Sequence, residues 1–338
     1  MRQSTVRFAA TAIRLADVTF PSDRVQIHRT RLAYIHLDNL LHFSKIDRDG
    51  RVDGYVAAYL PDELAVLFLR SGEVVTAARI TQEGRAVASI GAVLRDIREE
   101  VERGELAFCD APLEQLAWMY QSCASPASLR FADLSKPEEL FPVLQQERYT
   151  GVLELIAEGR LSYLRFDNGR FANGYYAGKP ANLTVAQYLE SLFRPASGGE
   201  PVRLMGSVFP IATDLPEQAS SAMLQSYREL FWRLVDFAER EAPGQVAQRA
   251  MKARDALIGA HPALEALSQP LDREAQELVT TPTDVTRALA NWCRQLLQEL
   301  EIVAPGVAPI VVKEATREQR FVLQKSGFYQ QLPWTVSW

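Results

Sequence analysis

Hydrophobic and polar positions follow the same order twice in the first two thirds of the chain. Each stretch opens with a short helical pattern, followed by two β-prone runs around a polar turn, a third run, an amphipathic helix and a last short run. The expected strands are Tyr55–Leu60, Leu64–Leu69, Glu73–Ala78 and Leu106–Cys109, then Val152–Ile156, Leu161–Phe166, Arg170–Tyr176 and Val202–Met205. This order predicts an α+β fold with two tandem antiparallel-sheet modules and flanking helices.

Helix starts and tight turns have their own signals within the repeat. Asp38 is the expected N-cap of the first opening helix, and Ser135-Lys136-Pro137-Glu138 has capping-box spacing before the second. Gly72 and Gly169 stand in the turn before each third strand, where a hairpin needs positive φ. The apolar positions of the two amphipathic helices are Ile90, Val93, Leu94, Ile97 and Val101, then Val185, Tyr188, Leu189 and Leu192.

The two stretches align at nearly constant offsets. Identical residues recur 97 positions later between Gly54 and Gly72, and 95 positions later between Leu94 and Glu105. Seven identities in 49 positions exceed chance only modestly, so the order of the patterns carries the hypothesis of an internal duplication.

The second stretch carries a set of short motifs in a fixed order. A strand and a helix with Leu140 and Leu144 precede Thr150-Gly151-Val152-Leu153, and then come Phe166 to Gly169 and Tyr175 to Gly178. With these motifs the segment at about 127–207 resembles the PATAN domain, named for the N-terminal region of PatA.

The segment at about 28–115 resembles a degenerate copy of the same domain. There Gly54 lacks the preceding threonine, and Ala78-Arg79 replaces the aromatic pair; in the second copy, Lys179-Pro180-Ala181-Asn182 departs from the family pattern. The resemblance implies a bacterial protein-interaction module whose partner is a response regulator or a surface-motility component. It implies no enzyme activity and no catalytic residues.

From Pro216 the pattern becomes helical. The expected helices lie within Pro216–Glu241, Val246–Ile258 and Pro262–Thr280, in a segment capped by Thr283 or Asp284, and in Lys313–Ser326 before Gly327. Pro305-Gly306-Val307-Ala308-Pro309 is expected to be a connector. These patterns predict an all-α C-terminal domain at 211–338, after one module at 1–120 and another at 121–210.

The tail from Gly327 to Trp338 holds four aromatic residues in twelve positions. Two interpretations remain open: the tail folds back to cap the helical core, or it is an exposed docking peptide, since large aromatic side chains anchor interfaces. Phe328, Tyr329 and Trp334 are therefore candidate interaction residues.

Composition narrows the class of protein. With 47% hydrophobic and 23% charged residues, the 338-residue chain has the composition of a globular protein, and its net charge of -5 provides no general attraction for nucleic acid. Three cysteines and four histidines match no disulfide framework or metal motif, and no phosphate-binding loop occurs. Asp47 to Asp53 lacks EF-hand spacing and is expected to be a polar turn. Without a signal-peptide core or an apolar span, a cytoplasmic location is expected.

The sequence therefore predicts a non-enzymatic regulatory adaptor that binds a protein partner, uses no cofactor or metal, and could form a homo-oligomer. The alternative is a small-molecule or cyclic-nucleotide sensor with a pocket between a module and the helical domain. Phe171, Tyr175 and Tyr176 are the candidate interaction residues of the second module. Because neighbours in a strand point to opposite sides, either Tyr175 or Tyr176 must lie outside the core of its own module. That tyrosine is expected to be exposed or to pack against the helical domain.

Overall fold

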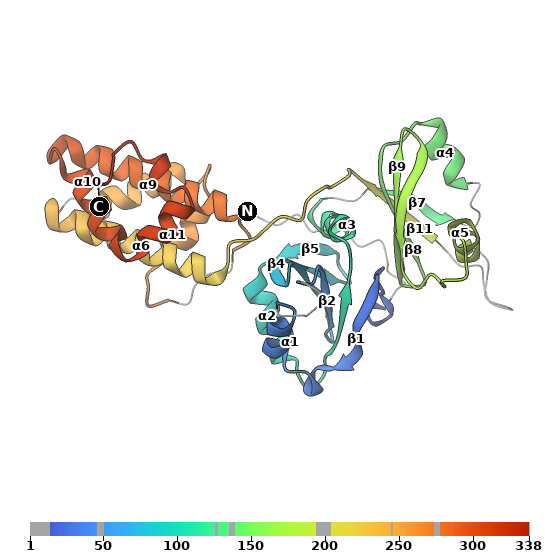
Figure 1. Ribbon diagram of the computed structural model, residues 1–338. Helices are drawn as coiled ribbons and strands as arrows, with labels where there is room; N and C mark the ends of the chain where they lie inside the picture. Colours follow the sequence, from blue (N-terminus) through green and yellow to red (C-terminus); the bar gives the residue numbers. More distant parts are fainter. Residues whose placement is uncertain are drawn as a thin grey trace. The chain divides into compact units, whose positions relative to one another are not determined.

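The computed structural model describes residues 14–45, 51–125, 128–134, 139–193, 204–244, 246–273 and 278–337. The chain forms two compact units, one that ends at Pro216 and one that begins at Glu217 (Figure 1). The first holds two antiparallel sheets and the second is helical, which confirms the α+β class. The unit boundary falls a few residues after the predicted domain boundary, and the two modules belong to one unit.

The first sheet has six strands in the order β1-β6-β2-β3-β4-β5. Its strands are β1 Arg24–Arg31, β2 Gly54–Tyr59, β3 Glu63–Arg70, β4 Glu73–Thr81, β5 Arg85–Ala88 and β6 Glu105–Asp110. Helices α1 (Leu37–Phe43) and α2 (Ile90–Glu99) cover one face, where Val93 and Ile97 pack on Leu67. Helix α3 (Leu113–Ala124) packs on the other face.

The second sheet has five strands in the order β10-β9-β8-β11-β7. Its strands are β7 Ser128–Leu134, β8 Gly151–Ala157, β9 Arg160–Asp167, β10 Arg170–Tyr176 and β11 Leu204–Phe209. Helices α4 (Phe141–Gln146) and α5 (Val185–Phe193) cover its outer face. Read from β7 to β10, the order matches that of the first sheet from β1 to β4, and β5 is the extra strand.

The two modules agree in strand register as well as strand order. In the first, Val66 pairs with Ala78, and in the second Tyr163 pairs with Tyr175, both 97 positions later. Each third strand also has a one-residue bulge, at Val75 and at Ala172, again 97 positions apart. The structure therefore confirms the duplication through the first three strands.

The offset predicted for the last strand is wrong. Tyr55 pairs with Cys109 and Val152 pairs with Phe209, so the last strands correspond at an offset of 100 instead of 95. The match of Glu105 with a residue 95 positions later is therefore coincidental. The strand expected at Val202–Met205 begins at Leu204 and continues to Phe209.

The glycine turns have the predicted geometry. Both residues of Ser71-Gly72 and of Asn168-Gly169 have positive φ, between 50° and 79°. The amide of Ser71 donates to the Asp53 carboxylate at 2.5 Å, and the amide of Asn168 donates to the Thr150 hydroxyl at 2.9 Å. Asp53 in the first module and Thr150 of the Thr-Gly motif in the second thus have the same role, since each accepts a hydrogen bond from the backbone of the turn.

Several local predictions need correction. His36, not Asp38, is the N-cap of α1, because its Nδ1 accepts from the amide of Asn39 at 3.4 Å. Helix α3 and strand β5 were not expected. Four consecutive residues of α3 from Leu116 to Met119 are buried, so the helix has no clear amphipathic period. The capping box at 135–138 and part of the polar turn at 47–53 lie outside the described residues.

The helical unit contains α6 Ser221–Glu241, α7 Val246–Leu257, α8 Ala263–Leu267, α9 Pro282–Val303, α10 Val307–Thr316 and α11 Arg320–Lys325. Thr281, not Thr283 or Asp284, caps α9, since its hydroxyl accepts from the amide of Asp284 at 3.1 Å. The connector expected up to Pro309 is shorter, because α10 already begins at Val307. Gly327 has φ +78° and follows the end of α11.

The aromatic tail folds back onto the helical unit. Phe328 is fully buried and Leu332 is buried, while Tyr329 and Trp334 are partly buried against the same core. At the centre of that core the rings of Phe231 and Trp292 stack with centroids 3.8 Å apart. The interpretation of the tail as a cap on the core is therefore confirmed.

A buried ion pair joins the two sheets of the first unit. Arg85 of β5 donates to the Glu154 carboxylate of β8 at 2.6 Å and to the Ser122 hydroxyl of α3 at 3.0 Å. The side chains of Arg85 and Glu154 are only 4% and 1% exposed. Around them, residues of both sheets and of α3 form one continuous apolar cluster, which includes Phe68, Trp118 and Ile156.

Arg85→Met should lower the free energy of unfolding by about 3–5 kcal/mol, because it leaves the Glu154 charge buried without its partner. The double variant Arg85→Met/Glu154→Leu should recover most of that loss. Arg98→Met is the control, since its pair with Asp38 is largely exposed, and it should cost about 1 kcal/mol or less. Urea denaturation gives all three values, and a loss for Arg85→Met no larger than the control would contradict the prediction.

Candidate functional site

Tyr175 and Tyr176 point to opposite sides of β10, as expected, but neither is an exposed anchor. The Tyr175 ring lies 5.2 Å from the ring of Trp118 on α3, and the Tyr176 ring lies 5.6 Å from that of Tyr188 on α5. Both residues are partly buried. Tyr175 is the one that lies outside the core of its own module, and it packs against α3 of the same unit.

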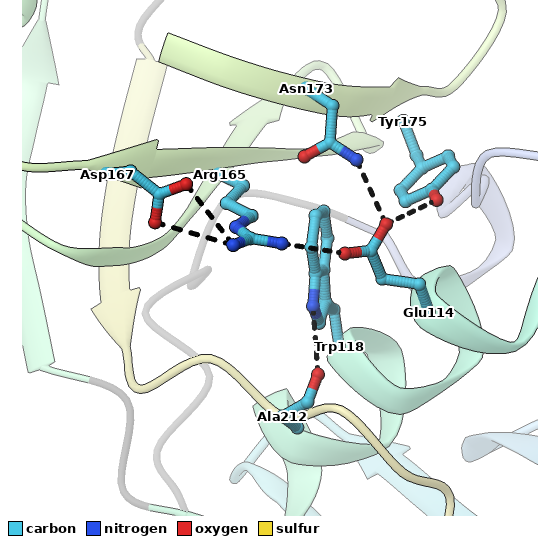
Figure 2. Close-up of polar contacts among 7 residues, drawn as sticks. All are labelled: Glu114, Trp118, Arg165, Asp167, Asn173, Tyr175 and Ala212. Carbon is cyan, nitrogen blue, oxygen red and sulfur yellow. Dashed lines mark hydrogen bonds and ion pairs between the residues drawn. The ribbon is translucent and has the colours of Figure 1, made fainter. Parts of the chain in front are cut away.

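Glu114, in the first turn of α3, collects the polar side chains on this side of β9 and β10 (Figure 2). Its Oε1 accepts from Arg165 at 3.2 Å. Its Oε2 accepts from the Asn173 amide and from the Tyr175 hydroxyl, both at 2.9 Å. Arg165 is shared with Asp167, whose carboxylate lies 3.2 Å away. The Glu114 carboxylate thus links α3 to the face of β10 that carries Asn173 and Tyr175.

The polar groups around Glu114 hydrogen-bond to one another and link α3 to β9 and β10. Burial, and then the hydrogen bond to Glu114, raise the pKa of Tyr175 above its ordinary value, so the phenol stays a proton donor. Beside it, the Trp118 indole donates to the Ala212 carbonyl at 3.1 Å. Both Glu114 oxygens are already engaged by Arg165, Asn173 and Tyr175, so the carboxylate is occupied by the protein itself.

Phe171 is the candidate residue that reaches the surface. It follows the Asn168-Gly169 turn and is 44% exposed. Its ring lies 6.2 Å from that of Phe166, which is buried and in turn lies 6.3 Å from Phe141 and 6.5 Å from Tyr149. Phe171 is thus the exposed end of an aromatic row that fixes its position.

Among the described residues, three more aromatic residues are exposed that the sequence pattern did not indicate: Tyr34, Phe43 and Phe321. Tyr34 and Phe43 of the first module are 79% and 60% exposed. In the sequence, Tyr34 follows the buried Leu32 and Phe43 follows the buried Leu40. The hydrophobic pattern therefore does not distinguish these exposed positions from core positions. Of the tail candidates, Phe328 is buried, which removes it as a docking residue.

A cavity of about 220 Å³ lies in the first unit, beside Arg29 and Tyr59. Its charged lining is balanced, with Arg29 and Arg103 against Glu63 and Glu105. Arg29 stacks on the Tyr59 ring at 3.9 Å and is bonded to Glu105 and to the Ala16 carbonyl. Burial raises the pKa of Glu63, which also faces Arg79.

The described residues contain neither a cluster of metal ligands nor a membrane-spanning helix. No group of three or more histidine, cysteine, aspartate or glutamate side chains is placed to hold a metal ion there. Every helix in that part of the chain is too short or too polar to cross a bilayer.

No protein-family model, curated protein or solved structure matches this chain. The resemblance to the PATAN domain therefore stays a prediction, and the function has to be inferred from the geometry of the chain itself.

Glu114→Ala should lower the free energy of unfolding by about 1–3 kcal/mol, because three partly buried donors lose their acceptor. Glu114→Gln should be milder, since the amide oxygen still accepts one hydrogen bond. Urea denaturation measures both, and amide hydrogen exchange should show the loosening in β10. If Glu114→Ala were as stable as the wild type, the hydrogen bonds of this cluster would contribute nothing to the free energy of unfolding.

Glu114→Gln should also move the pKa of Tyr175 back toward its ordinary value. Burial remains in this variant, but the nearby negative charge that opposes ionisation of the phenol is removed. Tyr175 should therefore ionise at a lower pH than in the wild type, as followed by NMR of ring-labelled tyrosine. An unchanged titration would mean that burial alone raises this pKa.

Proposed function

We propose that this protein is a non-enzymatic regulatory adaptor of the cytoplasm that binds a protein partner through its second module. The observation that carries the proposal is the position of Phe171, an aromatic side chain that is 44% exposed on a rigid hairpin at the edge of the sheet. Aromatic side chains held in this way commonly supply much of the binding energy of an interface.

The rest of the hairpin supports this assignment. Tyr175 packs on Trp118 on one face of β10, and Tyr176 packs on Tyr188 on the other. Glu114 also accepts a hydrogen bond from the Tyr175 hydroxyl. A partner would therefore meet a surface that is already ordered, which reduces the entropy lost on binding. The predicted partner classes, a response regulator or a motility component, follow from the PATAN resemblance alone.

The alternative, a small-molecule or cyclic-nucleotide sensor, has weaker support. The cavity beside Arg29 holds about 220 Å³, whereas ligand pockets usually measure about 300–1,000 Å³. Of its two arginines, Arg29 already pairs with Glu105, and Arg103 with Glu100. Equilibrium titration with cyclic nucleotides distinguishes the two functions, since saturable binding would favour the sensor.

Phe171→Ala should reduce capture of the partner from extracts of the native host at least tenfold, because the exposed ring is removed. The melting temperature should change by only a few degrees, since the ring lies outside the core. Phe321→Ala is the matched control: this ring is 69% exposed, lies in the helical unit and should leave capture intact. Equal capture by Phe171→Ala and the control would rule out this surface.

A further inference from the structure

The two modules differ at one sheet edge. In the first, β5 pairs with β4 in antiparallel register, with Ala77 opposite Ala88 and Ile80 opposite Arg85. In the second, β10 stands where β4 does, and it is the terminal strand of its sheet among the described residues. The positions that correspond to Ala77–Ile80 are Gly174–Ala177, at the shared offset of 97.

The outer edge of β10 presents two backbone positions. The Ala177 amide donates to the Leu161 carbonyl of β9 at 3.2 Å, so with the two-residue period of a strand the Tyr175 amide also faces β9. The N–H and C=O groups of Gly174 and Tyr176 then face away from the sheet. Neither residue carries a charge, although natural edges are commonly protected by charged residues or proline.

An extended segment of the chain lies against β9 just beyond the end of β10. Thr19 forms a parallel bridge with Arg160, and its amide donates to the Gly159 carbonyl at 2.9 Å. This bridge occupies the side of β9 on which β10 lies, because Leu161 donates to Thr19 and accepts from Ala177. Thr19 thus continues the line of β10 along β9, and this contact leaves the outer edge at Gly174 and Tyr176 uncovered.

We propose that the outer edge of β10 is a docking edge that pairs, antiparallel, with an extended segment of a partner protein. The proposal rests on the adaptor function and specifies how the partner binds. Backbone hydrogen bonds to Gly174 and Tyr176 would supply affinity, as in other cases of strand addition. The Tyr176 hydroxyl is buried without a hydrogen-bond partner in the described part of the chain, and it lies beside this edge.

The side chains of β5 indicate which partner segment fits. Opposite Ala77–Arg79 the first module places Ala88, Val87 and Ala86, all small or β-branched. In the second module Tyr176 folds over Gly174, with its hydroxyl 2.6 Å from where a Cβ of that glycine would stand. Tyr176 thus covers the face of Gly174 next to this edge, and by analogy with β5 the incoming strand has small side chains. A second copy would bring its own Tyr175 and Tyr176 to the same place and fits less well.

Grafting a copy of β5 into the second module tests whether the outer edge of β10 pairs with a further strand. Lys179-Pro180-Ala181-Asn182 is replaced in the full chain by a copy of Gln82–Ser89 that carries Arg85→Thr, because the partner of Arg85 is Glu154 of β8. The control graft is a glycine-serine segment of equal length. Amide exchange at Gly174 and Tyr176 should be at least tenfold slower with the strand graft than with the control. Equal exchange in two folded grafts would overturn the proposal.

Capture from host extracts then separates this proposal from the adaptor function. The strand graft, whose edge is filled, should lose at least nine tenths of the captured partner, while the glycine-serine graft retains it. Equal capture by both grafts would overturn the docking edge and leave the adaptor function intact; no capture by the wild type would overturn both. If exchange at Gly174 and Tyr176 slows with protein concentration alone, the occupant is a second copy and the partner proposal is wrong.

If the strand graft unfolds the module, the unaltered protein is mixed with a synthetic peptide of residues 83–90. Exchange at Gly174 and Tyr176 should slow as the peptide is added, while the inward-facing Tyr175 amide should not change. No slowing at millimolar peptide would overturn the proposal.

Discussion

The arrangement of the two sheets depends on one buried ion pair, between Arg85 of β5 and Glu154 of β8. A single charge in this apolar cluster would be strongly unfavourable, so each residue requires the other to be present and correctly placed. Burial by itself would lower the pKa of Arg85, but the Glu154 carboxylate raises it above its ordinary value, so the guanidinium stays charged. Apolar packing between the sheets tolerates some sliding, whereas this pair and Ser122 fix the position of β5 against β8 and α3.

The duplicated fold is used differently in its two halves. In the first module β5 fills the sheet edge and supplies Arg85 to the contact with the second module. In the second, the chain continues from β10 into Lys179-Pro180-Ala181-Asn182, and the proline of this segment has no amide to donate to a further strand. The same strand order therefore lets β5 of the first module contact the second module, whereas β10 has no further strand beside it among the described residues.

Much of the fold could be predicted from the sequence because it follows from local rules. The β-prone runs between polar turns located the strands, and the positive φ of Gly72 and Gly169 follows from the need for a tight hairpin. The last strand was misplaced because its offset depends on a segment between helix and strand whose length differs between the copies. Helix α3 was missed because it is buried around most of its circumference. The Glu114 cluster could not be predicted, since its members lie 51 to 61 residues apart and meet only through tertiary packing.

The same cluster bears on how an edge strand can serve recognition. An isolated edge is a weak template, because an incoming segment has to order both itself and the strand that it joins. Here one face of β10 is bonded to α3 through Asn173 and Tyr175, and the opposite face packs on α5 through Tyr176. Ordering of β10 is thus achieved on folding, and only the incoming segment loses conformational freedom when it binds. The polar contacts that engage both Glu114 oxygens are, by this reasoning, what makes the neighbouring backbone edge suitable for a partner.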